Sequence, residues 1–257
     1  MILDAMLPEV AVFVLETTRI SGVIIAAPLA WSSAPAQARV GLTLALALAI
    51  HGVWQPSLHA LDIVAVVSAV PVELLIGLAM GLVVRFALAA VQVAADVFAP
   101  MLGFGVASLF DPHAEVTETP LTQMLRQLAV LLALILGLHR VALGALLESF
   151  RVLPIGAVLR AGGAAEGLLE ASSAAMVSGA RLAMPIVAVL LATQVALAFV
   201  SRAAPAMQIF SVGFAVTLIC GGTVLVLALP DMATSIVEDL SHVGPRIERA
   251  LLDFAQG

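Results

Sequence analysis

Long apolar stretches separated by short polar breaks dominate this chain. The stretches run over residues 8–29, 36–54, 62–101, 121–138, 171–200 and 209–229. Because about 20 apolar residues cross the hydrocarbon core of a bilayer as a helix, this pattern predicts about six long hydrophobic helices. The second stretch has a short apolar core, residues 42–50, and therefore spans only marginally.

Several breaks in the pattern predict bends and connections. As one helix, residues 62–101 would reach about 60 Å, roughly twice the thickness of a bilayer core. We therefore expect a hairpin, a kinked pair or a helix that leaves the membrane there. Pro185 is expected to kink the stretch 171–200, because proline removes a helical hydrogen bond. Residues 140–163 contain three arginines and are interpreted as a semi-apolar connector.

The tail, residues 231–257, has a different period. Its apolar residues recur at roughly helical spacing and are Ile236, Leu240, Val243, Ile247 and Leu251. Charged residues lie between them, so we predict an amphipathic surface helix that is interrupted at Gly244-Pro245.

Composition narrows the class of protein. Of the 257 residues, 62% are hydrophobic and 11% are charged, whereas about 25% are charged in soluble domains. The sequence thus predicts an all-α polytopic membrane protein with one membrane-embedded domain over residues 1–257. A net charge of −6 without a basic cluster speaks against nucleic acid. We find no catalytic motif, metal-ligand spacing or cofactor-binding motif, so no enzyme activity and no cofactor are expected.

Charged residues inside the apolar stretches mark helices that pack in protein, because a lipid-facing charge costs at least about 2.5 kcal/mol. They are Glu16, Arg19, Glu73, Arg85, Asp96 and Arg181. Glu16 and Arg19 are expected to pair with each other or with a neighbouring helix. Glu73, Gly77 and Gly81 are spaced by four and share one helix face, where the glycines permit close approach of another backbone. We interpret Glu73 as a structural contact rather than a proton carrier.

A glycine-rich apolar segment, residues 103–112, opens into the acidic residues Asp111, Glu115 and Glu118. The glycines loosen the backbone and Asp-Pro stops any helix. Non-helical backbone between membrane helices is tolerated where it is buried in protein or lines a cavity. The segment is therefore a candidate pore, plug or binding site, and its alternative is an ordinary loop.

Four motifs in order resemble the FliR and SctT family of type III export-gate proteins. They lie at Arg19–Val40, Val72–Gly81, Met101–Pro112 and Ser201–Phe214. The chain departs from the family pattern by having Ala94-Ala95, Met101-Leu102 and Ala206-Met207-Gln208, where the family tends to have Ala-Gly, Gln-Met and Gln-Met-Asn. These departures affect local packing and suggest a divergent branch or a second export system in the same cell.

The resemblance implies a hetero-oligomer in the bacterial inner membrane, within the flagellar basal body. FliP-like and FliQ-like subunits would form the pore with this chain, whose helices would be arranged as hairpins. FlhA-like and FlhB-like components would deliver unfolded substrates. The implied plug residues are Met101, Gly103, Phe104, Gly105, Leu109 and Phe110. The implied structural or partner contacts are Arg19, Pro28, Arg39, Glu73, Gly77, Gly81, Arg202 and Pro205.

Three alternatives stay open from the sequence. A proton-coupled small-molecule transporter would use Glu73 or Asp96 and should show an internal repeat, which we do not find. A membrane-embedded enzyme would need converging catalytic groups. An injectisome export gate would share the implied assembly, but the Phe-Asp-Pro and Arg-Ala-Ala-Pro motifs favour the flagellar system.

Overall fold

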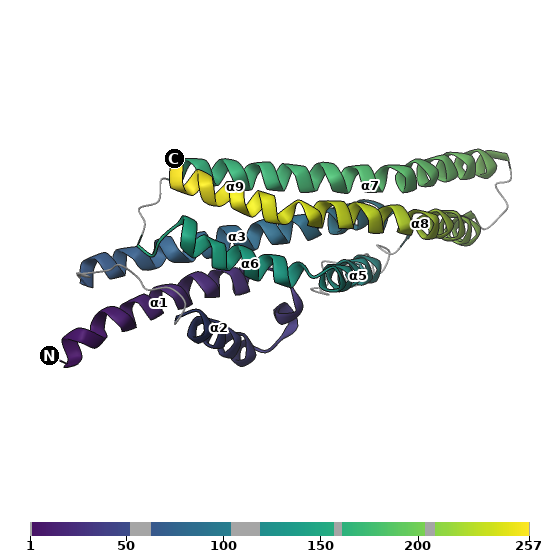
Figure 1. Ribbon diagram of the computed structural model, residues 1–257. Coiled ribbons are helices and arrows are strands. Elements are labelled where there is room, and N and C mark those ends of the chain that lie inside the picture. Colours follow the sequence, from purple (N-terminus) through teal and green to yellow (C-terminus); the bar gives the residue numbers. More distant parts are fainter. Residues whose placement is uncertain (1, 52–62, 104–118, 157–160, 204–208, 257) are drawn as a thin grey trace. The chain divides into compact units, whose positions relative to one another are not determined.

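The computed structural model describes residues 2–51, 63–103, 119–156, 161–203 and 209–256, and these are helical almost throughout (Figure 1). No strand occurs among them, which confirms the all-α prediction. The elements are α1 (Ile2–Ala26), the short 3-10 helix η1 (Ala30–Ser33), α2 (Ala36–His51), α3 (Ile63–Phe98), α5 (Pro120–Ile135), α6 (Leu138–Val152), α7 (Ala161–Ala203), α8 (Ile209–Ser241) and α9 (Val243–Gln256).

Several boundaries differ from the predicted ones. The stretch 62–101 forms the single 36-residue helix α3, so the hairpin alternative is wrong. The connector expected over residues 140–163 contains helix α6. The chain also stays helical through Gly244-Pro245, and the break falls at His242 instead. Pro245 is the third residue of α9, where a backbone N–H has no acceptor within the helix, so proline costs little there.

Within the described residues, three helical stretches are long and apolar enough to cross a membrane. They are Val66–Phe98, Gly167–Ala203 and Val212–Leu252. Helices α5 and α6 form a pair that bends at Leu136-Gly137, and this pair provides a fourth stretch if it is counted as one span. Helix α2, with 16 residues, is shorter than a full span. These lengths agree with a polytopic membrane protein.

The chain forms two compact units, each assembled from segments far apart in the sequence. Unit 1 comprises residues 1–87, 133–173 and 240–257, and unit 2 comprises residues 88–132 and 174–239. The largest buried apolar side chains of unit 1 are Leu15, Ile20, Leu29, Ile76, Met80, Leu138 and Leu146. Those of unit 2 are Phe98, Leu102, Ile186 and Leu190.

Helix α9 lies in the tail predicted to form an amphipathic helix, and its apolar face is covered. Val243, Ile247 and Leu251 are buried, and α9 packs against α6 within unit 1. Gly244 lies close to Val141 of α6 at this interface. The apolar face of α9 therefore belongs to the core of unit 1.

Candidate functional site

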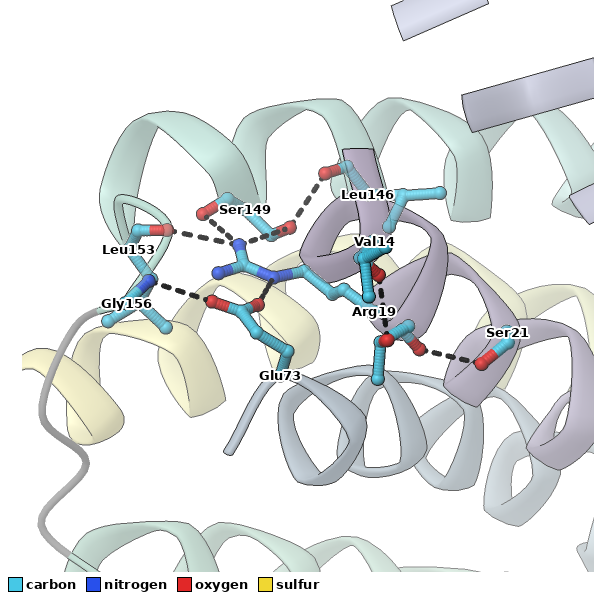
Figure 2. Close-up of polar contacts among 9 residues, drawn as sticks. Val14, Arg19, Ser21, Glu73, Leu146, Ser149, Leu153 and Gly156 are labelled. Carbon is cyan, nitrogen blue, oxygen red and sulfur yellow. Dashed lines mark hydrogen bonds and ion pairs between the residues drawn. The ribbon is translucent and has the colours of Figure 1, made fainter. Parts of the chain in front are cut away.

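A buried ion pair joins α1 to α3 in unit 1 (Figure 2). The Nε of Arg19 donates a hydrogen bond to Oε2 of Glu73 at 2.5 Å, and both side chains are fully buried. Arg19 thus pairs with a neighbouring helix, one of the two partners expected from the sequence, and not with Glu16. Because both charges are removed from water, each depends on the other for compensation.

The same guanidinium binds the C-terminal end of α6. Its Nη1 donates to the carbonyl oxygens of Ser149 and Leu153, both at 3.0 Å, and to Oγ of Ser149 at 3.3 Å. The last carbonyls of a helix lack partners within the helix and carry its negative dipole end, so a cation is favourable there. The ring of Phe150 lies 4.5 Å from the Arg19 guanidinium carbon and adds a cation–π contact.

Glu73 also binds the backbone that follows α6. Its Oε1 accepts a hydrogen bond from the backbone N–H of Gly156 at 3.0 Å. Gly156 has φ +82°, a conformation that glycine adopts without strain. We call Arg19, Glu73, Ser149, Leu153 and Gly156 the clamp, because they hold α1, α3 and the end of α6 together. Lysine could not replace Arg19, since it lacks the planar fork of donors.

Glycines let α1 and α3 approach with their backbones in contact. A Cβ at Gly77 would collide with the carbonyl oxygen of Arg19, and one at Gly81 would lie 2.6 Å from the Cβ of Ala26. A Cβ at Gly22 would lie 2.8 Å from the carbonyl oxygen of Leu74. Gly77 and Gly81 of α3 therefore face α1 at the level of Gly22. The sequence did not reveal this role of Gly22.

A second polar pair joins α1 to α2. Nδ1 of His51 lies 2.9 Å from Oε2 of Glu16, whose side chain is 1% exposed, whereas that of His51 is 33% exposed. The ring of Phe13 packs edge-on against His51 at 5.5 Å between centroids. The sequence did not reveal this contact, because nothing in the spacing of the residues indicates that the two helices are neighbours.

The predicted plug is described only at its beginning, in unit 2. Gly103 has φ +92°, and a Cβ there would collide with the ring of Phe214 in α8. Leu102 is buried, and it approaches Gly221 of α8, as does Leu190 of α7. Met101 is half-buried. The remaining predicted plug residues, Phe104, Gly105, Leu109 and Phe110, lie outside the described residues.

The other residues singled out in the sequence are dispersed. Pro28 follows α1 and Arg39 lies in the first turn of α2, both half-buried, while Arg202 is exposed in the last turn of α7. Pro205 lies outside the described residues. The expectation that charges within the apolar stretches pack in protein holds for Glu16, Arg19 and Glu73. Arg85, Asp96 and Arg181 are exposed within this chain, so for them the expectation stays a prediction.

The fold and the clamp define an all-α, multi-pass membrane protein whose N-terminal helices are fixed by buried charges. The model of the family described as "Bacterial export proteins, family 1" matches residues 10–243. This chain therefore belongs to that family. The matched region contains the whole clamp and the segment proposed as a plug.

Curated relatives agree with the family. The chain is 32% identical over 221 residues to the flagellar biosynthetic protein FliR of Escherichia coli, covering 84% of this chain and 83% of the relative. The FliR proteins of Caulobacter vibrioides and Bacillus subtilis are 25% and 27% identical, covering 88% and 78% of this chain and 91% and 79% of the relatives. These relationships confirm the FliR family and identify a membrane component of flagellum biogenesis and protein export.

Proposed function

We propose that this chain is a subunit of the flagellar type III export gate in the bacterial inner membrane. FliP-like and FliQ-like subunits would form with it the pore that unfolded flagellar proteins cross. FlhA-like and FlhB-like components would supply these substrates. The observation that carries the proposal is family membership over almost the whole chain, together with helices that are too apolar on their outer faces to be exposed to water.

Those outer faces belong to the longest apolar helices. In the most apolar part of α3, 61% of residues are buried, but only 17% are buried in the corresponding parts of α7 and α8. Exposed side chains include Met184, Leu191 and Phe199 of α7, and Ile219 and Leu227 of α8, each at least half exposed. Helices with this many exposed apolar side chains require lipid or partner helices around them. A hetero-oligomeric membrane pore supplies both.

Purification of the tagged chain at its natural expression level tests this proposal. We expect two small helical membrane proteins to remain bound after mild detergent extraction. Deletion of the gene should stop secretion of flagellar proteins, and the chain supplied from a plasmid should restore it. A chain that purifies alone or as a homo-oligomer, with secretion unaffected by its deletion, would contradict the proposal and favour a transporter.

Within this function, we propose that the segment 101–111 closes the pore. Bulky apolar side chains can exclude water from a constriction, while glycines allow the segment to yield to a passing chain. Met101, Phe104, Leu109 and Phe110 have the required bulk. The acids that follow, Asp111, Glu115 and Glu118, would keep the outer end hydrated.

Deletion of residues 105–110 should make the membrane permeable to small ions while the complex still assembles. Conductance or sensitivity of cells to small solutes measures the leak. Replacement of the same six residues by glycine and serine is a second variant, which keeps the length of the segment and removes its apolar bulk. Both variants should leak. A membrane that stays tight with an assembled deletion variant would identify the segment as a connector.

A further inference from the structure

The Glu16–His51 pair differs from the clamp in a way that matters for proton binding. The clamp joins a carboxylate to arginine, which stays protonated at every physiological pH. Glu16 instead faces histidine, the side chain that ordinarily gains and loses charge between pH 5 and 8. The carboxylate is buried at 1% exposure, and the imidazole is 33% exposed and so can exchange a proton with water.

Among the described residues of the helices packed around this pair, no charged side chain other than His51 is paired with Glu16. Arg19, three residues further along α1, is committed to Glu73 of α3 and to the carbonyls of α6. Glu9 on α1 and Arg85 on α3 are exposed. Arg39 lies about three turns before His51 on α2. A negative charge on Glu16 therefore depends on the proton held by this pair.

We propose that Glu16 and His51 form a proton-binding site that holds the C-terminal end of α2 against α1, and that the contact opens when the site loses its proton. With one proton bound, the pair is a buried carboxylate against an imidazolium, or two neutral groups joined by a hydrogen bond. His51 is the last residue of α2, where the helix dipole favours the imidazolium. Either form leaves no net charge buried.

Removal of that proton leaves a carboxylate without a countercharge, and such a charge is strongly unfavourable when it is buried. Separation of the helices lets water reach it. The direction is therefore fixed: the contact is closed where the pair holds one proton, and it opens as the pH rises and that proton is lost. This inference concerns α1 and α2 alone and does not depend on the proposed pore.

Distances between spin labels on the two helices test the inference in the full chain, reconstituted in lipid. Val14 and Leu48 are exposed on α1 and α2, and Cys220→Ala removes the single cysteine. Between pH 6 and 9, the ratio of open to closed populations should rise about tenfold or more, since a one-proton equilibrium changes up to tenfold per pH unit. Glu16→Gln should stay closed at every pH, because it keeps a hydrogen-bonding group without a charge. His51→Gln should open at lower pH than the parent chain.

Histidine NMR of the unlabelled chain gives a second measurement that requires no cysteine variants. The His51 signal, assigned by its loss in His51→Gln, should change when the contact opens, and this change should be absent in Glu16→Gln. A parent chain that stays closed through pH 9, or whose opening is the same in Glu16→Gln, would overturn the inference.

Discussion

Replacement of Glu73 by alanine should destabilise the folded chain by about 3–5 kcal/mol, because it leaves the buried guanidinium of Arg19 without a countercharge. The N–H of Gly156 would lose its acceptor as well. Thermal stability in detergent, read from the monodisperse fraction left after heating, measures the effect. Complex yield and export should fall together with stability.

Two control variants distinguish the loss of this buried carboxylate from the loss of a carboxylate in general. Glu148 is exposed and pairs with Arg151 one turn away at 3.4 Å, so Glu148→Ala should cost less than about 1 kcal/mol. Glu73→Gln keeps the side-chain shape and one acceptor oxygen, but its NH2 group faces a second donor and Arg19 loses its countercharge, so its stability should fall between those of Glu73→Ala and Glu148→Ala. The complex that still assembles with Glu73→Gln should retain most export. Equal stability of Glu73→Ala and Glu148→Ala would contradict the clamp. Export abolished in an assembled Glu73→Gln complex would indicate proton coupling instead.

The second large effect is expected for Gly77→Ala, a change of a single methyl group. That methyl would collide with the backbone carbonyl of Arg19, which cannot rotate away as a side chain could. The two helices must separate, and the ion pair between Arg19 and Glu73, which lies one turn before Gly77 on α3, would be pulled apart with them. We expect a loss of at least about 1–3 kcal/mol, as for other overpacked cores, and little assembled complex.

Helical glycines elsewhere provide matched controls for that change. A Cβ at Gly144 of α6 or Gly222 of α8 meets no atom within 4 Å. Alanine at these positions should be neutral or stabilising by up to about 1 kcal/mol, because alanine favours the helix more than glycine does. If Gly77→Ala is as stable and as active as Gly144→Ala, the backbone contact between α1 and α3 does not limit the fold.

Some boundaries could not be predicted because they depend on packing. The arginines of residues 140–163 suggested a connector, yet Leu138, Ala142 and Leu146 lie on one buried face of α6. Arg140 and Arg151 are exposed, as the opposite face of such a helix allows. The period of α9 was predicted correctly, but α6 covers its apolar face. Periodicity identifies an apolar face and does not identify what covers it.

The sequence by itself determined the class of this protein. The length of its apolar stretches and the scarcity of charge require helices in a membrane, and the order of its motifs indicated the export family. Only the tertiary structure decided which groups meet. Arg19 and Glu73 are 54 residues apart, and Arg19 and Ser149 are 130 apart. The cost of burying a charge guarantees that a partner exists, but the identity of that partner depends on which helices become neighbours, and local sequence does not encode that.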